Sequence, residues 1–230
     1  MKIEMHVHCR PVSICAHHPA EEFPKMLKDA GIDGCVLTNH CYQNHMDRLS
    51  DDLKEQAKIY VDVFERAKKA GEEIGFQVFF GCELKLMTQP HKPEFLLYGL
   101  KIEDFLDTYP LYNEDQKTVF DFCNKKDILM IQAHPYRSEQ GYLPADMQYV
   151  HGVEVYNPHP RFNPRVEESL KLANDNNLLK TIGSDFHEMT QAGNTAMIFP
   201  DDTQDQFMIR DYLKKGNAKF YVKNKSIIID

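Results

Sequence analysis

The chain has 230 residues and a mass of 26.8 kDa, and with 42% hydrophobic and 27% charged residues it can form one sizeable globular core. The formal net charge of −8 provides no general basic face, which disfavours long nucleic acid as a partner and favours a small substrate. The N-terminal residues MKIEMHVHCR contain no apolar signal region, and no stretch approaches the roughly 18 apolar residues of a membrane helix, so we expect no membrane association.

Short apolar runs alternate with longer amphipathic ones along the chain. The predicted strands are Lys2–His8, Gly34–Asn39, Phe76–Glu83, Phe95–Leu100, Ile128–Ala133, Gly152–Tyr156 and Lys180–Ser184, with a weaker eighth at Thr195–Phe199. The predicted helices are Pro19–Ala30, Met46–Ala70, Asp115–Lys125, Arg161–Asn176 and Asp205–Lys215. This alternation predicts an α/β protein with a mainly parallel sheet, either closed as a barrel or open and doubly wound.

The chain shows no internal repeat, low-complexity tract or break in composition. We therefore expect a single domain over residues 1–230, with residues 219–230 forming a C-terminal packing extension. The apolar Ser226–Ile229 run near the end is expected to dock on the body of the domain.

Side chains that can bind metals follow the ends of five predicted strands. His6 and His8 end the first strand two residues apart, so both imidazoles point to the same face. In parallel α/β proteins the carboxyl ends of the strands gather at one rim, where active sites lie. The side chains that we expect at this rim are His6, His8, His40, Glu83, His134, Asp185 and His187.

Imidazole and carboxylate ligands suit Zn, Mn or Fe, and so many of them could hold two or three divalent ions. Clustered ions favour hydrolysis, because they generate a hydroxide nucleophile near neutral pH and bind both oxygens of a phosphoryl transfer. Each short motif alone is weak, since a histidine pair on a strand is commonly structural. The full set of motifs, in this order along the chain, is much more specific evidence for a metal site.

The segments HVH, TNH, GCE, AHPYR, GVEVYN and GSDFH together resemble the PHP family, the polymerase and histidinol phosphatase phosphoesterases. The resemblance covers roughly residues 1–200 and keeps the order of the motifs. It implies a distorted (β/α)7 barrel, similar to a TIM barrel, with a trinuclear metal centre. Family members commonly hydrolyse phosphomonoesters or nucleotide phosphodiesters. The resemblance therefore implies a phosphoesterase, and we expect a small phosphomonoester as substrate, as for a histidinol phosphatase.

The resemblance also implies a ligand set. By matching position, His6, His8, Glu83 and Asp185 would bind a first ion, and Glu83 would bridge to a second ion that His134 binds. His40 and His187 would bind a third ion. A further family ligand lies between the first two strands, where this chain offers His17 or His18, and we favour His17.

Two positions depart from the family pattern. Asn39 replaces an aspartate that supports the site, which weakens the charge around the ligands. Phe95 stands where the family often has a histidine ligand before the fourth strand, and Glu94 or His91 could substitute for it. A loosely held second ion is equally consistent with the sequence.

Arg137 resembles a family arginine that binds substrate phosphate, a task for which the planar guanidinium is suited. In the mechanism that we expect, hydroxide attacks phosphorus while the ions and Arg137 stabilise the developing charge. His187 or His17 could donate the proton to the leaving oxygen. Glu154 and Asn157 are expected to support the site without binding an ion.

Two other functions stay open at this point. The same ions could hydrolyse a C–N bond, as amidohydrolase barrels do. Alternatively, the chain could be a degenerate barrel that binds metal or a partner without catalysis, which Asn39 and Phe95 would favour.

The six cysteines form no CxxC pair, which predicts reduced thiols and a cytoplasmic location. Cys9 and Cys82 adjoin ligands but should point away from them, because strand side chains alternate. Four further histidines are expected mainly at the surface, namely His45, His91, His151 and His159.

Overall fold

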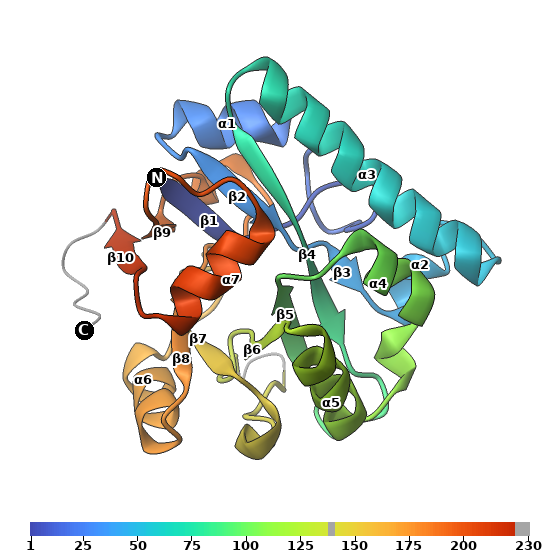
Figure 1. The fold of residues 1–230 in the computed structure, drawn as a ribbon, viewed down its shortest axis with the longest axis vertical. Coiled ribbons are helices and arrows are strands. Elements are labelled where there is room, and N and C mark those ends of the chain that lie inside the picture. Colours follow the sequence, from blue (N-terminus) through green and yellow to red (C-terminus); the bar gives the residue numbers. More distant parts are fainter. Residues whose placement is uncertain (138–140, 224–230) are drawn as a thin grey trace.

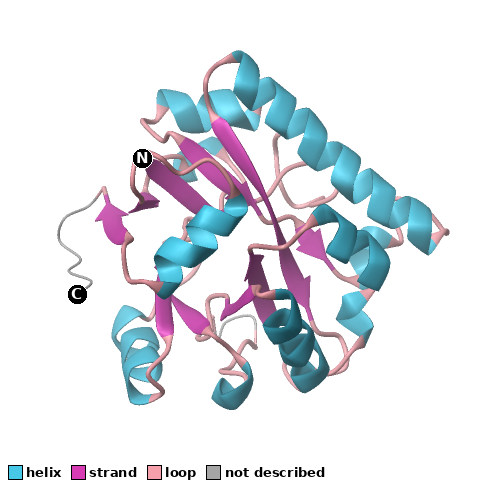
Figure 2. Ribbon diagram, viewed as in Figure 1, coloured by secondary structure: helices cyan, strands magenta, loops and turns pink. Residues whose placement is uncertain are grey.

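The computed structural model describes residues 1–137 and 141–223, which form one mixed sheet with helices packed around its outside (Figures 1 and 2). The strands are β1 (Lys2–Val7), β2 (Gly34–Leu37), β3 (His40–Cys41), β4 (Gln77–Lys85), β5 (Glu94–Tyr98), β6 (Leu129–Gln132), β7 (Gly152–Tyr156), β8 (Leu179–Ile182), β9 (Thr195–Ile198) and β10 (Lys219–Val222). The helices are α1 (Phe23–Asp29), α2 (Gln43–Met46), α3 (Leu53–Glu73), α4 (Ile102–Thr108), α5 (Gln116–Lys126), α6 (Val166–Asp175) and α7 (Gln206–Lys214).

The sheet curls into a nearly closed barrel. Its strands follow the order β10-β9-β1-β2-β4-β5-β6-β7-β8, and β3 pairs with β4. The two ends of the curl meet just after β8, where the N–H of Phe186 donates to the carbonyl of His6 and the N–H of His8 donates to the carbonyl of Phe186, both at 2.9 Å. Seven strands therefore run around the barrel (β1, β2 and β4 to β8), as the (β/α)7 prediction requires.

One barrel strand runs opposite to the others. Strand β5 is antiparallel to both β4 and β6, whereas β1, β2, β4, β6, β7 and β8 run the same way. The start of β5 therefore lies at the rim where its neighbours end, with Glu94 paired to Lys85 in the β4–β5 register. This reversal was not predicted, and it brings a carboxylate to the rim.

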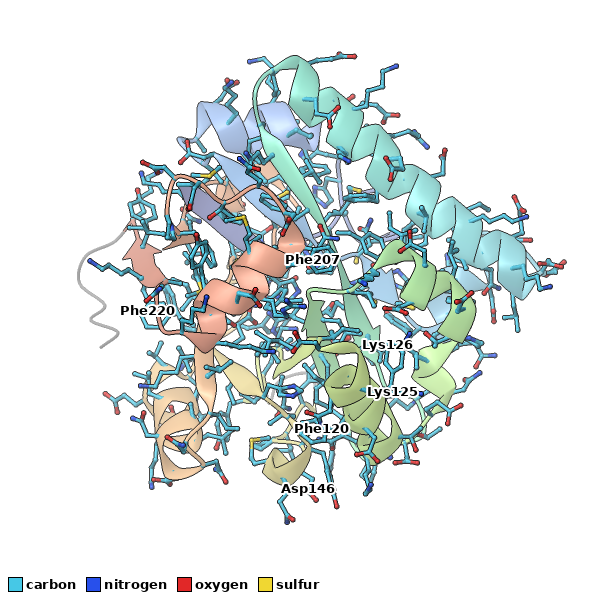
Figure 3. All side chains as sticks on the ribbon, viewed as in Figure 1. Phe120, Lys125, Lys126, Asp146, Phe207 and Phe220 are labelled. Carbon is cyan, nitrogen blue, oxygen red and sulfur yellow. The ribbon has the colours of Figure 1, made fainter. Side chains whose placement is uncertain are left out.

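Aspartate caps explain where three helices begin. Asp52, Asp115 and Asp205 precede α3, α5 and α7, and each carboxylate accepts a hydrogen bond from a free backbone N–H of the first turn. At the other end of α5, Lys125 and Lys126 lie on the outside of the molecule, where their charges complement the helix C-terminus (Figure 3).

The helix predictions differ from the structure in four places, the first being α1, which was predicted from Pro19 and begins at Phe23. The helix predicted from Met46 begins only at Leu53, because Met46 ends the short helix α2 and the cap at Asp52 begins α3. Helix α6 begins at Val166 rather than Arg161, since Arg165 has a left-handed backbone (φ 48°) that a helix cannot contain. Helix α4 was not predicted.

The first half of the C-terminal extension pairs with the sheet, because β10 is antiparallel to β9. Strand β9 in turn pairs antiparallel with the start of β1. The apolar Ser226–Ile229 run lies outside the described residues. Within the described ranges, no helix is both long and apolar enough to cross a membrane.

Candidate metal centre

The imidazoles of His6 and His8 lie side by side at the end of β1, with no exposed surface. The Nε2 atom of His6 is 3.1 Å from a carboxylate oxygen of Glu83 and 3.4 Å from one of Asp185. The Nε2 atom of His8 is 3.1 Å from the same Asp185 oxygen, Oδ1. The ends of β1 and β4 and the loop after β8 thus converge, as the alternation of side chains along the strands predicts.

Glu83 lies at the middle of the cluster. Its Oε1 atom is 3.2 Å from His134 Nε2, and its Oε2 atom is 2.6 Å from His40 Nδ1 and 3.5 Å from His8 Nε2. Each carboxylate oxygen therefore faces a different set of imidazoles, so Glu83 would be able to offer one oxygen to each of two ions.

Glu94 joins this cluster at the beginning of the reversed strand β5. It is 4% exposed, and its Oε2 atom lies 3.4 Å from His134 Nε2. Phe95 beside it is fully buried in the apolar core. Of the two substitutes considered from sequence, the structure brings Glu94 to the other ligands, whereas His91 is exposed in the loop before β5.

Asp185 and His187 follow β8 in a loop that has to pass very close to β1. A Cβ atom at Gly183 would lie 2.5 Å from the His6 Cβ, so the approach requires glycine. The backbone of Asp185 (φ 55°) and of His134 (φ 29°) is in the left-handed region, which is costly for these residues and typical of functional sites.

Arg137 reaches the same cluster from the loop after β6. Its guanidinium donates hydrogen bonds of 2.8 Å to Asp185 Oδ2 and 2.9 Å to Asn157 Oδ1. The ring of Phe162 packs against the guanidinium, with its centroid 4.8 Å from the central carbon. Arg137 is 8% exposed and lines the cleft beside the cluster.

Outer contacts orient the histidine rings. His6 Nδ1 lies 2.9 Å from Glu154, whose other oxygen accepts hydrogen bonds from the backbone N–H of His134 and from Asn157. His8 Nδ1 lies 3.1 Å from the Ser13 hydroxyl. If both Nδ1 atoms carry the proton, both Nε2 atoms are free to bind an ion, because the hydrogen bond at one ring nitrogen fixes which nitrogen faces the metal.

Asn39 belongs to this supporting layer. Its side-chain oxygen accepts hydrogen bonds from the Ser13 hydroxyl at 2.9 Å and from the backbone N–H of Cys9 at 2.8 Å. Ser13 in turn contacts His8, so Asn39 supports a candidate ligand without carrying charge.

The donor atoms at the centre fit divalent ions. Five buried atoms that face one another at the centre make no regular hydrogen bond, although they lie 2.6–3.5 Å from oppositely charged groups of the cluster: His6 Nε2, His8 Nε2, His40 Nδ1, Glu83 Oε2 and Asp185 Oδ1. Leaving so many buried polar atoms without partners costs about 1–3 kcal/mol for each group, and native proteins rarely do so without a reason. Two overlapping sets of donors lie within 4.8 Å of one another, one of His6, Glu83 and His134 and one of His6, His8 and Asp185.

The electrostatics of the cluster also suit cations. Burial opposes ionisation of Glu83, but the imidazoles of His6 and His40 hold its pKa well below the usual range. Burial likewise opposes ionisation of Asp185, whose pKa is held well below the usual range by His6 and Arg137. Burial and the neighbouring rings of His40 and His187 hold the pKa of His8 well below its ordinary value, which keeps that ring neutral and able to bind an ion.

A cleft of about 260 Å³ opens beside the cluster. Its lining includes Arg137, Arg161, Phe162 and His187. Loops that follow different strands supply these side chains, as expected at the carboxyl end of an α/β barrel.

The structure places His17 at the rim of this cleft. Its side chain is 51% exposed, and its Nδ1 atom is 3.4 Å from Glu188. His18 lies 3.9 Å from Glu22. In the same segment between β1 and β2, the thiol of Cys15 lies 3.1 Å from His187 Nε2.

The surface position expected for the remaining histidines was wrong for His45, and His151 and His159 are partly buried. His45, expected at the surface, is 6% exposed and lines the cleft, because the short helix α2 packs it against the carbonyl of Val12. His159, also expected at the surface, is partly buried in the same cleft. Cys15 was overlooked because only the cysteines adjoining predicted ligands were considered. Cys9 and Cys82 are buried, as strand alternation predicts.

No protein-family model and no curated protein sequence matches the chain. Solved structures do. A two-domain protein from Bacteroides vulgatus, described as containing a predicted PHP-like metal-dependent phosphoesterase, is 22% identical with a TM-score of 0.67; the match covers 96% of this chain and 64% of that one. PsfC from Pseudomonas syringae is 16% identical with a TM-score of 0.68, over 98% of this chain and 92% of that one. The lesion-specific endonuclease EndoQ from Pyrococcus furiosus is 14% identical with a TM-score of 0.54, over 95% of this chain and 57% of that one.

At these identities the likeness concerns the fold. The barrel, its strand order and the similarity to these structures confirm the fold that the ordered histidine and carboxylate motifs predict. The chain has the fold of the PHP-like metal-dependent phosphoesterases.

Proposed function

We propose that this chain is a hydrolase that cleaves a small phosphomonoester, in the manner of a histidinol phosphatase, with two or three divalent ions of Zn, Mn or Fe. The observation that carries the proposal is the set of five buried nitrogen and oxygen atoms that make no regular hydrogen bond and converge beside a cleft. Such atoms are explained by bound ions and poorly explained by a structural role.

The distances support the proposed ligand set. One ion would lie among His6, His8, Glu83 and Asp185, and a second among Glu83, Glu94 and His134. His40 and His187 would bind a third. Bound ions of this kind supply an activated hydroxide nucleophile and Lewis acids for the phosphoryl oxygens.

The chain's own residues complete the proposed site. The guanidinium of Arg137 borders the cleft, where its fork can donate to two phosphate oxygens. Asp185 and Asn157 hold the guanidinium in place through the hydrogen bonds described above. The proton for the leaving oxygen would come from His187 if its ring is spared from the third ion, or from His17 at the rim of the same cleft.

The size of the cleft and the net charge of −8 support a small substrate. One similar structure is that of a lesion-specific endonuclease, which supports the end of a short oligonucleotide as a second candidate substrate. The cysteine pattern further supports a cytoplasmic location, since all six thiols are unpaired.

The test is phosphate release from a generic aryl phosphate by protein stripped with a chelator and reloaded with Mn or Zn. We expect release that depends on the metal in the wild type and is lost in His8→Ala while circular dichroism shows the fold retained. An Arg66→Lys variant on the outside of α3 serves as the matched control with unchanged release.

A parallel assay of ammonia release from amide substrates separates the amidohydrolase alternative. Ammonia without phosphate would replace the proposal with C–N hydrolysis. Neither product with any metal would favour the non-catalytic barrel.

A further inference from the structure

The thiol of Cys15 differs from the other cysteines of the chain. All six are unpaired, and five are buried, whereas Cys15 is exposed to the cleft. It lies in the loop between β1 and α1, which also carries Ser13 and His17.

Backbone hydrogen bonds fix where this loop presents the thiol. The N–H of Ala16 donates to the carbonyl of Ser13, and the N–H of His17 donates to the carbonyl of His187, at 3.0 and 2.9 Å. The Nε atom of Arg10 donates to the carbonyl of Ala16 at 2.7 Å. Cys15 is therefore held between two anchored residues and next to the loop that carries His187.

The thiol meets donor atoms from three other segments. Its sulfur is 3.1 Å from His187 Nε2, and the donor atoms of Cys15, His40 and His45 lie within 4.8 Å of one another. These side chains come from the β1–α1 loop, from β3, from α2 and from the loop after β8.

A buried and unpartnered donor atom points to the same place. His8 has no exposed surface, and its Nε2 atom makes no hydrogen bond. A donor atom of this ring lies within 4.8 Å of donor atoms of His40 and His187, the two rings that flank the thiol.

We propose that Cys15 is a thiolate ligand of a cation that it binds together with His40 and His187, and that His17 is not a ligand of this cation. The assignment rests on the proposed metal-dependent function, since it concerns one ion of the same centre. In this assignment the ligand from the β1–α1 loop is the sulfur of Cys15, which already contacts His187. The imidazole of His17 is exposed, and its nearest charged partner is Glu188.

A sulfur ligand changes which metal this position prefers. Thiolates favour Zn over hard ions such as Mn, whereas the carboxylates of Glu83, Glu94 and Asp185 at the deeper positions accept Mn readily. We therefore expect a centre whose outer ion is Zn even when Mn is offered for the others.

The test is a titration of the metal-free full-length chain with cobalt(II), because a thiolate bound to cobalt gives a charge-transfer absorption in the near ultraviolet that nitrogen and oxygen ligands do not give. We expect this band in the wild type and its loss in Cys15→Ser. It should persist in Cys123→Ala, which removes a buried thiol from α5, and in His17→Ala.

Alkylation provides an independent readout. Iodoacetamide should modify Cys15 in the metal-free chain, and loading with Zn should protect it, while the buried cysteines react in neither state. A band that survives in Cys15→Ser, or no band in a wild type fully loaded with cobalt, would overturn the assignment. Loss of the band in His17→Ala would overturn the exclusion of His17. Because the band reports binding alone, a chain that shows it but hydrolyses no phosphoester contradicts the proposed function and not this assignment.

Discussion

The guanidinium of Arg137 donates a hydrogen bond of 2.8 Å to Asp185, so the residue proposed to bind phosphate is joined directly to a proposed metal ligand. Arg137→Lys keeps the charge and loses the planar fork. We expect kcat/KM for an aryl phosphate to fall by about 10- to 100-fold, since a hydrogen bond to a charged group contributes about 1.5–3 kcal/mol. Unchanged steady-state kinetics would show that Arg137 does not contact the substrate. Arg66→Lys on α3 is the control.

Glu94 should hold the second ion. Its carboxylate lies 3.4 Å from His134 Nε2, and Glu94→Gln removes a charge while keeping the shape. We expect at least about tenfold weaker binding of one ion in a calorimetric Mn titration, in the range that disturbed metal sites show. His91→Ala in the exposed loop before β5 should bind like the wild type. The opposite ranking of the two variants would contradict the ligand set.

Glu154 should affect the affinity for metal ions, although it is not one of the proposed ligands. It contacts the Nδ1 atom of His6 and accepts a hydrogen bond from the backbone N–H of His134. Glu154→Gln is expected to lower metal affinity by about 10- to 100-fold with the fold retained. Glu168→Gln on α6, where the side chain is 43% exposed and is not a proposed ligand, is the matched control, and equal affinities in the two variants would show that ring orientation does not depend on Glu154.

The stability of the metal-free chain should depend on Glu4. This carboxyl is fully buried, and burial raises its pKa to about 7, although hydrogen bonds from the Ser184 and His6 backbones lower it. The ordinary value is 4.5. Because the folded-state pKa is the higher one, the unfolded chain loses this proton first as the pH rises. The free energy of unfolding therefore falls between about pH 4.5 and 7, by on the order of 3 kcal/mol.

Glu4→Gln removes this titration. The variant should gain stability relative to the wild type at pH 8 and show little difference at pH 4.5, as measured by urea unfolding in the presence of a chelator. A stability difference that is the same at both pH values would mean that Glu4 titrates normally in the folded chain.

The sequence predicted the parts of the centre that depend on strand ends. His6, His8, Glu83 and Asp185 meet because side-chain alternation and the common direction of β1, β4 and β8 bring them to one rim. Those rules apply to each strand separately, so a single sequence is enough to apply them.

The remaining features depend on how segments pack against each other. The reversal of β5 brings Glu94 to the rim, and an apolar run such as Phe95–Leu97 has the same pattern in either direction. Cys15 reaches His187 because a loop folds back across the barrel, and no periodicity describes that path. Asp52 was not identified from the sequence as the cap of α3, and the break between α2 and α3 was therefore missed.

The most direct test of the central claim is the number of ions per chain, measured by elemental analysis on protein purified without a chelator. The buried donor atoms predict two or three divalent ions in the wild type and at least one fewer in Glu83→Gln, since Glu83 faces His6, His8, His40 and His134. Less than one ion per chain, with the same value in the variant, would contradict the account.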